Sequence, residues 1–275
     1  MSMNSFHGRK SRPAPAVREK ARPERHGLRL DQVLVEQGLA ASRSIAQRLI
    51  AAGRVACEGE VLLKPAQLLP ADARLQVAQD DGDPYVSRGA LKLAGALHHS
   101  GVDPRGWVCL DVGQSTGGFS DCLLRAGAAR VVGVDVGHDQ LHPRLKADPR
   151  VSAFEGINCR TLEAADLRET MPAVGFDLIV ADVSFISLTL ILPRLPALLA
   201  PEGQMLLLVK PQFEVGPGGI GKGGIVRDPA RYAEVERKLR ACCEALHLEV
   251  LGWFESPITG GDGNREFFIW TRHAH

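Results

Sequence analysis

The chain has 275 residues, of which 45% are hydrophobic and 24% are charged, and its formal net charge is +1. These values allow one large domain and a small one. They exclude a protein that is basic throughout, so any contact with nucleic acid has to come from local patches. No apolar run reaches the length of a membrane span, and the N-terminus lacks the apolar segment of a secretory signal.

The cysteines and histidines indicate a reduced protein without a metal site. The six cysteines form no C-x-x-C pair, and most lie in apolar surroundings, which favours buried thiols over disulfides. None of the nine histidines has the spacing of metal ligands. We therefore expect no metal, no membrane contact and a cytoplasmic location.

Residues 1–26 are rich in arginine, lysine and proline, with seven basic residues against Glu19 and Glu24. A segment of this composition cannot bury a core, so we predict a disordered basic tail. Such a tail would add non-specific attraction to phosphates. A solubilising role without binding is an equal alternative.

Residues 27–79 have the pattern of a small α+β domain. Leucines and valines at helical spacing over residues 28–39 predict a first helix, which Gly38 ends. Ser42 is placed to cap a second helix, Arg43 to Ala52. Three short extended segments then predict a small sheet: Arg54–Cys57, Val61–Leu63 and Ala73–Val77.

The motifs of this module point to RNA. In chain order they are Arg29-Leu-Asp31, Ser42-Arg43-x-x-Ala46, Ile50-x-x-Gly53-x-Val55, Gly59 and Lys64-Pro65. In this combination the module resembles the S4 RNA-binding domain, which implies phosphate contacts from basic side chains on or beside the helix pair. The candidates are Arg29, Arg43, Arg48, Arg54, Lys64 and, in the segment that follows, Arg88. The alternative is that these are solvated surface charges, because acidic residues lie among them.

Residues 80–84 are acidic and contain glycine and proline, so we interpret them as a linker to a larger domain, residues 85–275. The segment Tyr85–Leu93 opens a helix that we expect to end near Ser100. Lys92 lies among leucines in this helix, so we expect its ammonium group to be partly desolvated.

Strands and helices alternate through the large domain. The predicted strands are Val108–Val112, Arg130–Val136, Val151–Glu155, Phe176–Asp182, Gln204–Val209, Leu248–Ser256 and Arg265–Thr271. Helices are expected between them, notably over Ser187–Leu199 and Ala230–Leu246. This alternation predicts a mostly parallel sheet covered on both faces. The loop Pro257–Asn264 looks like a hairpin connection, so the final strand is expected to be antiparallel.

The stretch Leu110-Asp-Val-Gly-Gln-Ser-Thr-Gly-Gly-Phe119 joins the first of these strands to a helix over Ser120 to Ala126, and the next strand ends in Asp135. Strand, glycine-rich turn, helix, strand and acidic end build a nucleotide pocket at the carboxyl ends of two parallel strands. Asp111 would repel a pyrophosphate but suits a ligand with a cationic end, which favours S-adenosylmethionine over a dinucleotide. A structural turn without a ligand is the alternative.

Four ionisable residues stand beside apolar elements at one edge of the predicted sheet. Asp182 and Lys210 each end a strand, Glu266 begins the last strand, and Lys92 lies on the preceding helix. Ligands of open α/β sheets bind at this edge. Any one of the four alone would be read as a structural salt-bridge partner, but the four together favour a site.

These four residues resemble the Lys-Asp-Lys-Glu tetrad of FtsJ-type ribose 2′-O-methyltransferases. With the S4-like module in front, the chain is similar to the TlyA family of rRNA methyltransferases, some of whose members are called haemolysins. The resemblance covers about residues 27–270. It rests on Val86-Ser-Arg-Gly-Ala-Leu-Lys-Leu93, Asp111-Val-Gly-Gln-Ser-Thr-Gly-Gly-Phe119, Asp182-Val-Ser-Phe-Ile-Ser187, Val209-Lys-Pro-Gln-Phe-Glu214 and Gly263-Asn-Arg-Glu-Phe267.

The resemblance implies a fold and an activity. The fold is that of a class I S-adenosylmethionine-dependent methyltransferase, Rossmann-like with a mostly parallel seven-stranded sheet, preceded by a small α+β S4-like domain. The activity is ribose 2′-O-methylation of cytidine in 16S or 23S rRNA, or both, with S-adenosylmethionine as cofactor and rRNA or ribosomal subunits as partners. Lys210 would be the base, held by Asp182, while Lys92 and Glu266 orient the hydroxyl and the network.

The resemblance also implies residues for donor binding. They are Asp111, Gly113, Ser115, Thr116, Gly117, Gly118, Phe119, Asp135, Asn158, Asp166 and Asp182. Gln114 departs from the family, which usually has a small residue there; its side chain either crowds the donor pocket or points away. We interpret the glycine-rich loop Lys222–Asp228 as facing RNA, with a plain structural connection as the alternative.

Two other functions are weighed against this hypothesis. One is an RNA-binding ribosome-assembly factor with a vestigial methyltransferase site, against which the intact tetrad argues. The other is a membrane-active haemolysin, which no apolar span or export signal in the sequence supports. Donor binding tests the first and liposome leakage tests the second.

Overall fold

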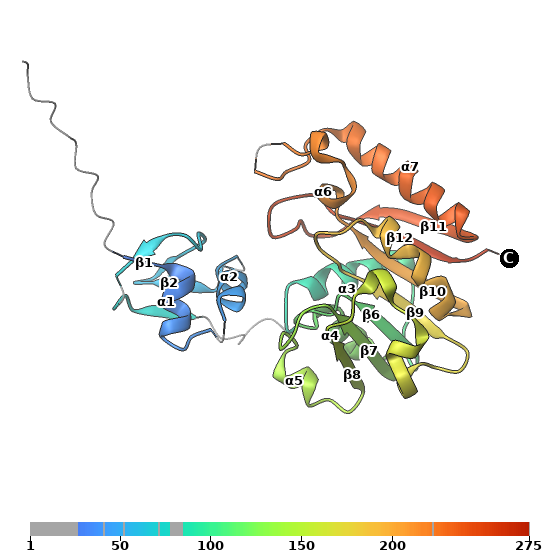
Figure 1. Cartoon of the computed structure of the whole chain (residues 1–275), viewed down its shortest axis with the longest axis horizontal. Coiled ribbons are helices and arrows are strands. Elements are labelled where there is room, and N and C mark those ends of the chain that lie inside the picture. The colour runs from blue at the N-terminus through green and yellow to red at the C-terminus, as the bar shows by residue number, and fades with distance from the viewer. Residues whose placement is uncertain are drawn as a thin grey trace, which may run out of the picture. The chain divides into compact units, whose positions relative to one another are not determined.

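The computed structural model describes residues 27–40, 42–51, 53–70, 72–77, 85–221 and 223–274, with only the backbone of Arg48 and Pro217. The basic tail and the linker predicted above lie outside the described residues, as does the side chain of Arg48. The chain divides into two compact units, one up to Val77 and one from Ala78 onwards. Figure 1 shows both units, which are described separately below.

The first unit consists of two helices and two small sheets. Helices α1 (Leu30–Glu36) and α2 (Arg43–Ala51) pack around a core that includes Leu30, Leu34 and Ile50. The predicted first helix begins later than expected, because Leu28 and Arg29 form strand β1 and pair with β4 (Leu68–Leu69). The second sheet has the order β3-β2-β5, with bounds β2 (Val55–Cys57), β3 (Glu60–Val61) and β5 (Leu75–Val77).

A buried carboxylate joins the two helices of this unit. Asp31 on α1 accepts two hydrogen bonds of 3.0 Å from Arg29, one of 3.0 Å from Arg43 and one of 2.8 Å from Gln47. The bonds from Arg29, followed by those from Gln47 and Arg43, hold the pKa of Asp31 well below its ordinary value. Two of the predicted phosphate contacts, Arg29 and Arg43, therefore already stabilise the fold.

The second unit is built on one seven-stranded sheet of order β11-β12-β10-β9-β6-β7-β8. Its strands are β6 (Val108–Val112), β7 (Arg130–Asp135), β8 (Val151–Glu155), β9 (Phe176–Ala181), β10 (Leu199–Val209), β11 (Leu248–Glu255) and β12 (Phe267–His273). Strand β12 runs antiparallel to both of its neighbours, and β6 to β10 are parallel. The predicted mostly parallel sheet with an antiparallel last strand is thus confirmed.

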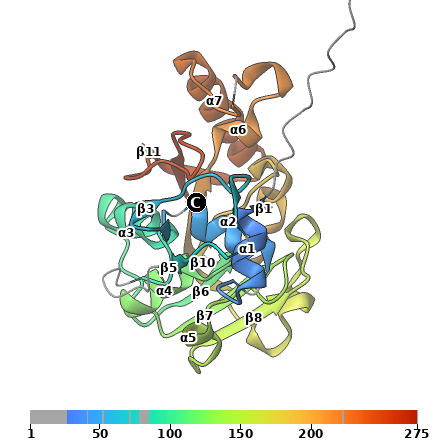
Figure 2. The ribbon, with the colours of Figure 1, turned by 90° about the vertical axis from the view of Figure 1, so that its left-hand side faces the viewer.

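Apolar side chains cover both faces of this sheet. Alternate residues of a strand point to opposite faces, so Leu110 and Val112 enter one core cluster while Cys109 enters the other. Helices α3 (Gly89–Ser100), α4 (Gly118–Arg125) and α5 (Pro143–Lys146) pack on the Cys109 side, and α7 (Pro229–Ala245) packs on the Leu110 side. Helices α6 (Pro211–Glu214) and α7 lie towards β11, and α5 lies towards β8 (Figure 1, Figure 2).

One predicted helix is wrong. Residues 187–199 form three successive 3₁₀ turns, Leu188–Leu190, Leu192–Arg194 and Pro196–Leu198, and Leu199 already belongs to β10. The reason is local: Pro193 and Pro196 carry no backbone N–H, so α-helical hydrogen bonds cannot run through this segment. Its leucines still reach the core, because turns of about three residues also bring apolar side chains back to one side.

Candidate active site

The four tetrad residues meet at the carboxyl edge of the sheet. Asp182 follows β9, Lys210 follows β10, Glu266 precedes β12, and Lys92 lies on α3. Lys210 Nζ is 2.6 Å from Asp182 Oδ1, and Lys92 Nζ is 2.7 Å from Glu266 Oε2 and 3.8 Å from Asp182 Oδ2. The four side chains therefore form one chain of ion pairs, Glu266–Lys92–Asp182–Lys210.

Burial and charge set the ionisation of the two carboxyl groups in this chain. Burial alone would raise the pKa of Asp182, but the ammonium groups of Lys210 and Lys92 lower it below its ordinary value. Glu266 is almost fully buried, and burial raises its pKa against the opposing effect of Lys92. Lys92 is also buried, which confirms the predicted desolvation. The pKa values of the two carboxyl groups of the tetrad are thus shifted in opposite directions, that of Asp182 downwards and that of Glu266 upwards.

The loop after Asp182 carries a feature that the sequence pattern did not predict. Phe185 is 91% exposed, has a φ of +64°, and contacts the ring of Phe213 with centroids 5.1 Å apart. Its neighbour Ser184 accepts a hydrogen bond of 2.7 Å from Lys210 Nζ. A left-handed backbone is unfavourable for a bulky side chain, and a large apolar residue in water gains nothing for folding. This aromatic ring beside the tetrad therefore suggests a partner outside the chain.

A second buried carboxylate fixes that loop. Glu214 on α6 accepts hydrogen bonds of 2.6 Å from Ser187 Oγ, 2.6 Å from Leu188 N and 2.9 Å from Lys238 Nζ on α7. The segment after Lys210 is thereby tied to the end of the Asp182 loop. The contacts of Glu214 with Ser187 and Leu188 therefore help to fix the distance between Asp182 and Lys210, in addition to the ion pair between those two residues.

Asn264 links the loop that precedes Glu266 to the glycine-rich loop Lys222–Asp228. Its Nδ2 donates to Gly224 O at 3.0 Å and to Asp262 Oδ2 at 2.8 Å, and its Oδ1 accepts from Val226 N at 2.9 Å. Asn264 is 1% exposed. The hydrogen bonds of Asn264 with Gly224 and Val226 give the described residues of the glycine-rich loop a structural role. Lys222 lies outside them, and the RNA-facing role stays a prediction.

Asp135, which the sequence predicts as a partner of ribose hydroxyls, also closes the turn after β6. Asp135 accepts hydrogen bonds of 2.8 Å from Ser115 N and 2.7 Å from Gly137 N. The carboxylate is half-buried, and each of its oxygens has a second lone pair for a ligand hydroxyl. Asp135 can therefore shape the turn and still accept hydrogen bonds from a ribose.

The glycines of this turn face other parts of the chain. A Cβ on Gly113 would lie 2.6 Å from the carbonyl oxygen of Asp182, so glycine lets the turn contact the tetrad loop. On Gly117 it would lie 2.2 Å from Leu145, and on Gly118 2.3 Å from Ser87 Oγ. Close packing within the protein is therefore a reason for each of these glycines, in addition to the ligand approach that the sequence predicts.

Asp111 ends a buried hydrogen-bond chain behind the turn. Its Oδ2 accepts from Ser120 Oγ at 2.7 Å, and Ser120 Oγ accepts from Gln114 Nε2 at 2.8 Å. Asp111 Oδ1 is buried and has no hydrogen-bond partner among the residues that the structure describes. Burial raises the pKa of Asp111 to about 7, with the hydrogen bond from Ser120 opposing this rise and the charge of Asp182 adding to it.

Gln114, the departure from the family pattern, points away into the protein. Its side chain is buried against β7, where a Cβ on Gly133 would lie 2.0 Å from Gln114 Cδ. Glycine at 133 therefore makes room for glutamine at 114. Of the two alternatives given above for Gln114, the structure shows the second.

Gly133→Ala is expected to lower the free energy of unfolding by about 1–3 kcal/mol, because the new methyl group displaces the Gln114 side chain. Adding Gln114→Ala should recover most of that loss. Urea unfolding of the two single variants and the double variant measures the coupling between the sites. Additive effects of the two substitutions would contradict the packing of Gln114 over Gly133.

The remaining predicted donor residues have varied local roles. Asn158 is exposed and caps the 3₁₀ turn after β8, next to Ile157, whose N–H donates to Asp135 O. Asp166 accepts from Glu163 N at 2.9 Å and so caps the next turn. Phe119 is buried in the core near Phe268, so its ring does not face a ligand. Thr116 is half-buried in the turn.

The predicted RNA contacts lie in both units. Lys64 and Arg88 are exposed, Arg54 is half-buried, and Arg29 and Arg43 keep partly exposed guanidinium groups beside Asp31. All six cysteines are free thiols. Within the described ranges no group of three or more His, Cys, Asp or Glu residues could hold a metal ion, and no helix is long and apolar enough to cross a membrane.

The sheet order, the glycine-rich turn and the acidic end of β7 define a class I methyltransferase, and the Lys-Asp-Lys-Glu chain of ion pairs distinguishes it within that class. Comparison with known families agrees. A model described as FtsJ-like methyltransferase matches residues 85–273, and a model described as S4 domain matches residues 28–75. The chain belongs to the FtsJ-like methyltransferase family and, by the relatives below, to its TlyA group.

Relatives match over nearly the whole chain. The 16S/23S rRNA (cytidine-2′-O)-methyltransferase TlyA of Mycobacterium tuberculosis is 44% identical over 246 residues, 89% of each chain. Hemolysin A of Brachyspira hyodysenteriae is 36% identical, covering 87% of this chain and 98% of its own. A solved structure from Streptococcus thermophilus, described as a candidate hemolysin, superposes with a TM-score of 0.69 at 38% identity over 90% of this chain and 89% of its own.

Proposed function

We propose that this protein transfers a methyl group from S-adenosylmethionine to the ribose 2′-oxygen of a cytidine in 16S or 23S rRNA, or both. The observation that carries the proposal is the continuous chain of ion pairs from Glu266 through Lys92 and Asp182 to Lys210, with 2.6 Å between the last two. The named activity of the 44% identical relative, which acts on 16S and 23S rRNA, supports the choice of substrate.

The turn after β6 carries groups that suit the binding of S-adenosylmethionine. Asp111 is fully buried, so its charge favours a cationic ligand group through the turn and not by direct contact, whereas Asp135 offers acceptors for ribose hydroxyls. We assign the binding to the backbone from Gly113 to Phe119, to the side chains of Ser115, Thr116 and Asp135, and to Asn158, Asp166 and Asp182, with Asp111 acting through its charge. When bound, S-adenosylmethionine supplies a methyl group activated by a sulfonium, with a neutral thioether as leaving group.

The tetrad supplies orientation and a base. A ribose hydroxyl is a weak nucleophile, so it has to be aligned and relieved of its proton as it attacks. The neutral form of Lys210 takes that proton, and Asp182 and Ser184 hold its amino group in place. Lys92, fixed by Glu266, donates to the nucleophile or its phosphate and orients it. The proton then leaves Lys210 to solvent.

Phe185 is placed to stack on a base of the bound RNA, since unpaired bases are commonly held on aromatic side chains. Phe185→Ala is expected to remove about 1–3 kcal/mol of binding, and so to lower kcat/KM for rRNA by about five- to 150-fold. Donor affinity should stay unchanged. Steady-state methyl transfer with Phe185→Tyr as control measures this, because tyrosine keeps the stacking face. Equal activity of Phe185→Ala and wild type would contradict the stacking role.

The direct test is transfer of labelled methyl groups from S-adenosylmethionine to free rRNA, separate ribosomal subunits and whole ribosomes. We expect label on ribose, recognised because a 2′-O-methyl group blocks alkaline cleavage of the following phosphodiester bond. The best substrate among the three narrows the target. Label on a base would overturn the assignment to the ribose oxygen. Folded protein that transfers label to none of the three substrates would overturn the proposal and favour the RNA-binding assembly factor.

A further inference from the structure

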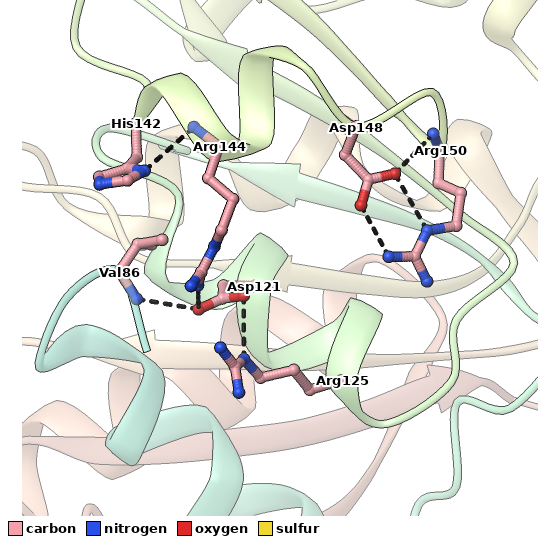
Figure 3. A network of polar contacts seen from close by, with 7 residues as sticks. All are labelled: Val86, Asp121, Arg125, His142, Arg144, Asp148 and Arg150. Atoms are coloured by element: carbon pink, nitrogen blue, oxygen red, sulfur yellow. Dashed lines mark hydrogen bonds and ion pairs between the residues drawn. The ribbon is translucent and has the colours of Figure 1, made fainter. Parts of the chain in front are cut away.

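Three arginines surround one cavity of the second unit that no tetrad residue lines. The cavity has a volume of about 230 Å³. Arg125 comes from α4, Arg144 from α5, and Arg150 from the turn before β8; Asp121 and Asp148 also line the cavity. Leu124 and Leu145 complete the lining. Figure 3 shows Asp121 between Arg125 and Arg144, with Asp148 and Arg150 as a separate pair.

Asp121 holds two of these arginines in fixed positions. Its oxygens contact Arg125 Nε at 3.1 Å and Arg144 Nη2 at 2.8 Å, and Oδ2 also accepts from Val86 N at 2.8 Å. The Asp121 side chain is only 6% exposed. The ring of Tyr85 lies 5.3 Å from the Arg125 guanidinium carbon and gives it a further contact. The carboxylate is therefore enclosed, and the two guanidinium groups are preorganised.

The side of the cavity that faces solvent presents donors. The side chains of Arg125, Arg144 and Arg150 are 40%, 52% and 48% exposed, against 20% for Asp148. Within the described part of the chain, Arg125 uses only Nε and Arg144 only Nη2 for side-chain hydrogen bonds. Their remaining N–H groups are free for a ligand. Three guanidinium groups against two carboxylates leave the lining with one excess positive charge.

We infer that this cavity binds a backbone phosphate of the RNA substrate, outside the tetrad. Planar guanidinium groups match the oxygens of a phosphate, and a phosphodiester carries the single negative charge that the cavity lacks. The contact reads no base and helps to hold the strand while the tetrad acts. The inference rests on the proposed function for the identity of the ligand, and on the cavity itself for its charge and shape.

Equilibrium binding of an unmodified rRNA fragment to the full chain tests the inference without methyl transfer. We compare Arg144→Gln and Arg150→Gln with wild type over a range of salt concentrations. Each variant should bind about tenfold more weakly at low salt, and the slope of log affinity against log salt should fall by about 0.7–0.9 per lost phosphate contact. Arg240→Gln is the matched control, since Arg240 is a half-exposed arginine paired with Glu236 on α7; it should bind as wild type.

The outcomes distinguish the proposed methyl transfer from the proposed phosphate site, and an RNA phosphate from a free phosphate ion. Variants at 144 and 150 that bind RNA like Arg240→Gln, with an unchanged salt slope, would overturn the inference even if methyl transfer is observed. A reduced slope would support it even if no methyl transfer is found. Calorimetric titration with inorganic phosphate is expected to show no saturable binding; saturable binding that Arg144→Gln abolishes would assign the cavity to a free anion and overturn the RNA assignment.

Discussion

Replacing Lys210 by alanine is expected to lower kcat for methyl transfer by about 10²–10⁴-fold, the usual contribution of a general base. The variant loses the group that we propose takes the proton of the 2′-hydroxyl. It also leaves Asp182 with Lys92 at 3.8 Å as its remaining tetrad cation. Donor binding should change little, because the turn after β6 keeps its own contacts. Single-turnover transfer of labelled methyl groups to rRNA measures the effect.

Lys210→Arg separates the base from the positive charge at this position. Arginine keeps a cation beside Asp182 but stays protonated at neutral pH, so it cannot accept the proton. We expect it to be nearly as inactive as Lys210→Ala. Lys146→Ala removes an exposed lysine of the same charge, paired with Asp139 at 3.2 Å, and should leave the rate unchanged. Substantial activity in Lys210→Arg would mean that charge alone is needed and that another group is the base.

The strands of the large domain were predictable because each one shows a strong local signal. Short segments rich in apolar residues give β6 and β8 with the predicted bounds, and β9 and β11 within one residue of them. The segment 187–199 failed because its leucines have helical spacing while two prolines remove the donors that a helix needs. Strand β4 was missed because two residues that pair with β1 carry no periodicity of their own.

The candidate site was predictable to the extent that its residues occupy strand ends. Asp182 and Lys210 follow from the rule that parallel strands end at one edge, and Glu266 follows because the antiparallel last strand begins at that edge. The role of Lys92 depended on the family resemblance. The rule does not give the distances between the four groups. Phe185 could have been noticed as an aromatic residue in the loop that follows Asp182. Asp121 gave no signal, since its partners Val86 and Arg144 are distant in sequence.

The buried carboxyl group of Asp111 makes stability depend on pH. Its folded-state pKa of about 7 lies above the ordinary value of 3.8, so the folded protein binds more protons than the unfolded chain between these values. The contribution of Asp111 to stability therefore falls as pH rises through this window, and it is smallest above pH 7, where a buried charge faces Asp182. A tenfold change in an acid dissociation constant corresponds to about 1.4 kcal/mol, so the whole window is worth at most about 4 kcal/mol.

Asp111→Asn keeps the shape of the side chain and removes this titration. Between pH 5.5 and 8 the free energy of unfolding of wild type should fall by about 2 kcal/mol more than that of the variant. Urea unfolding at both pH values measures the difference, and the titration of other carboxyl groups cancels in the comparison. Saturating S-adenosylmethionine should reduce the difference, because a cationic ligand beside Asp111 stabilises the ionised form. Parallel pH profiles of the two proteins without the ligand would show that Asp111 is already ionised at pH 5.5, and so that Ser120 compensates for its burial.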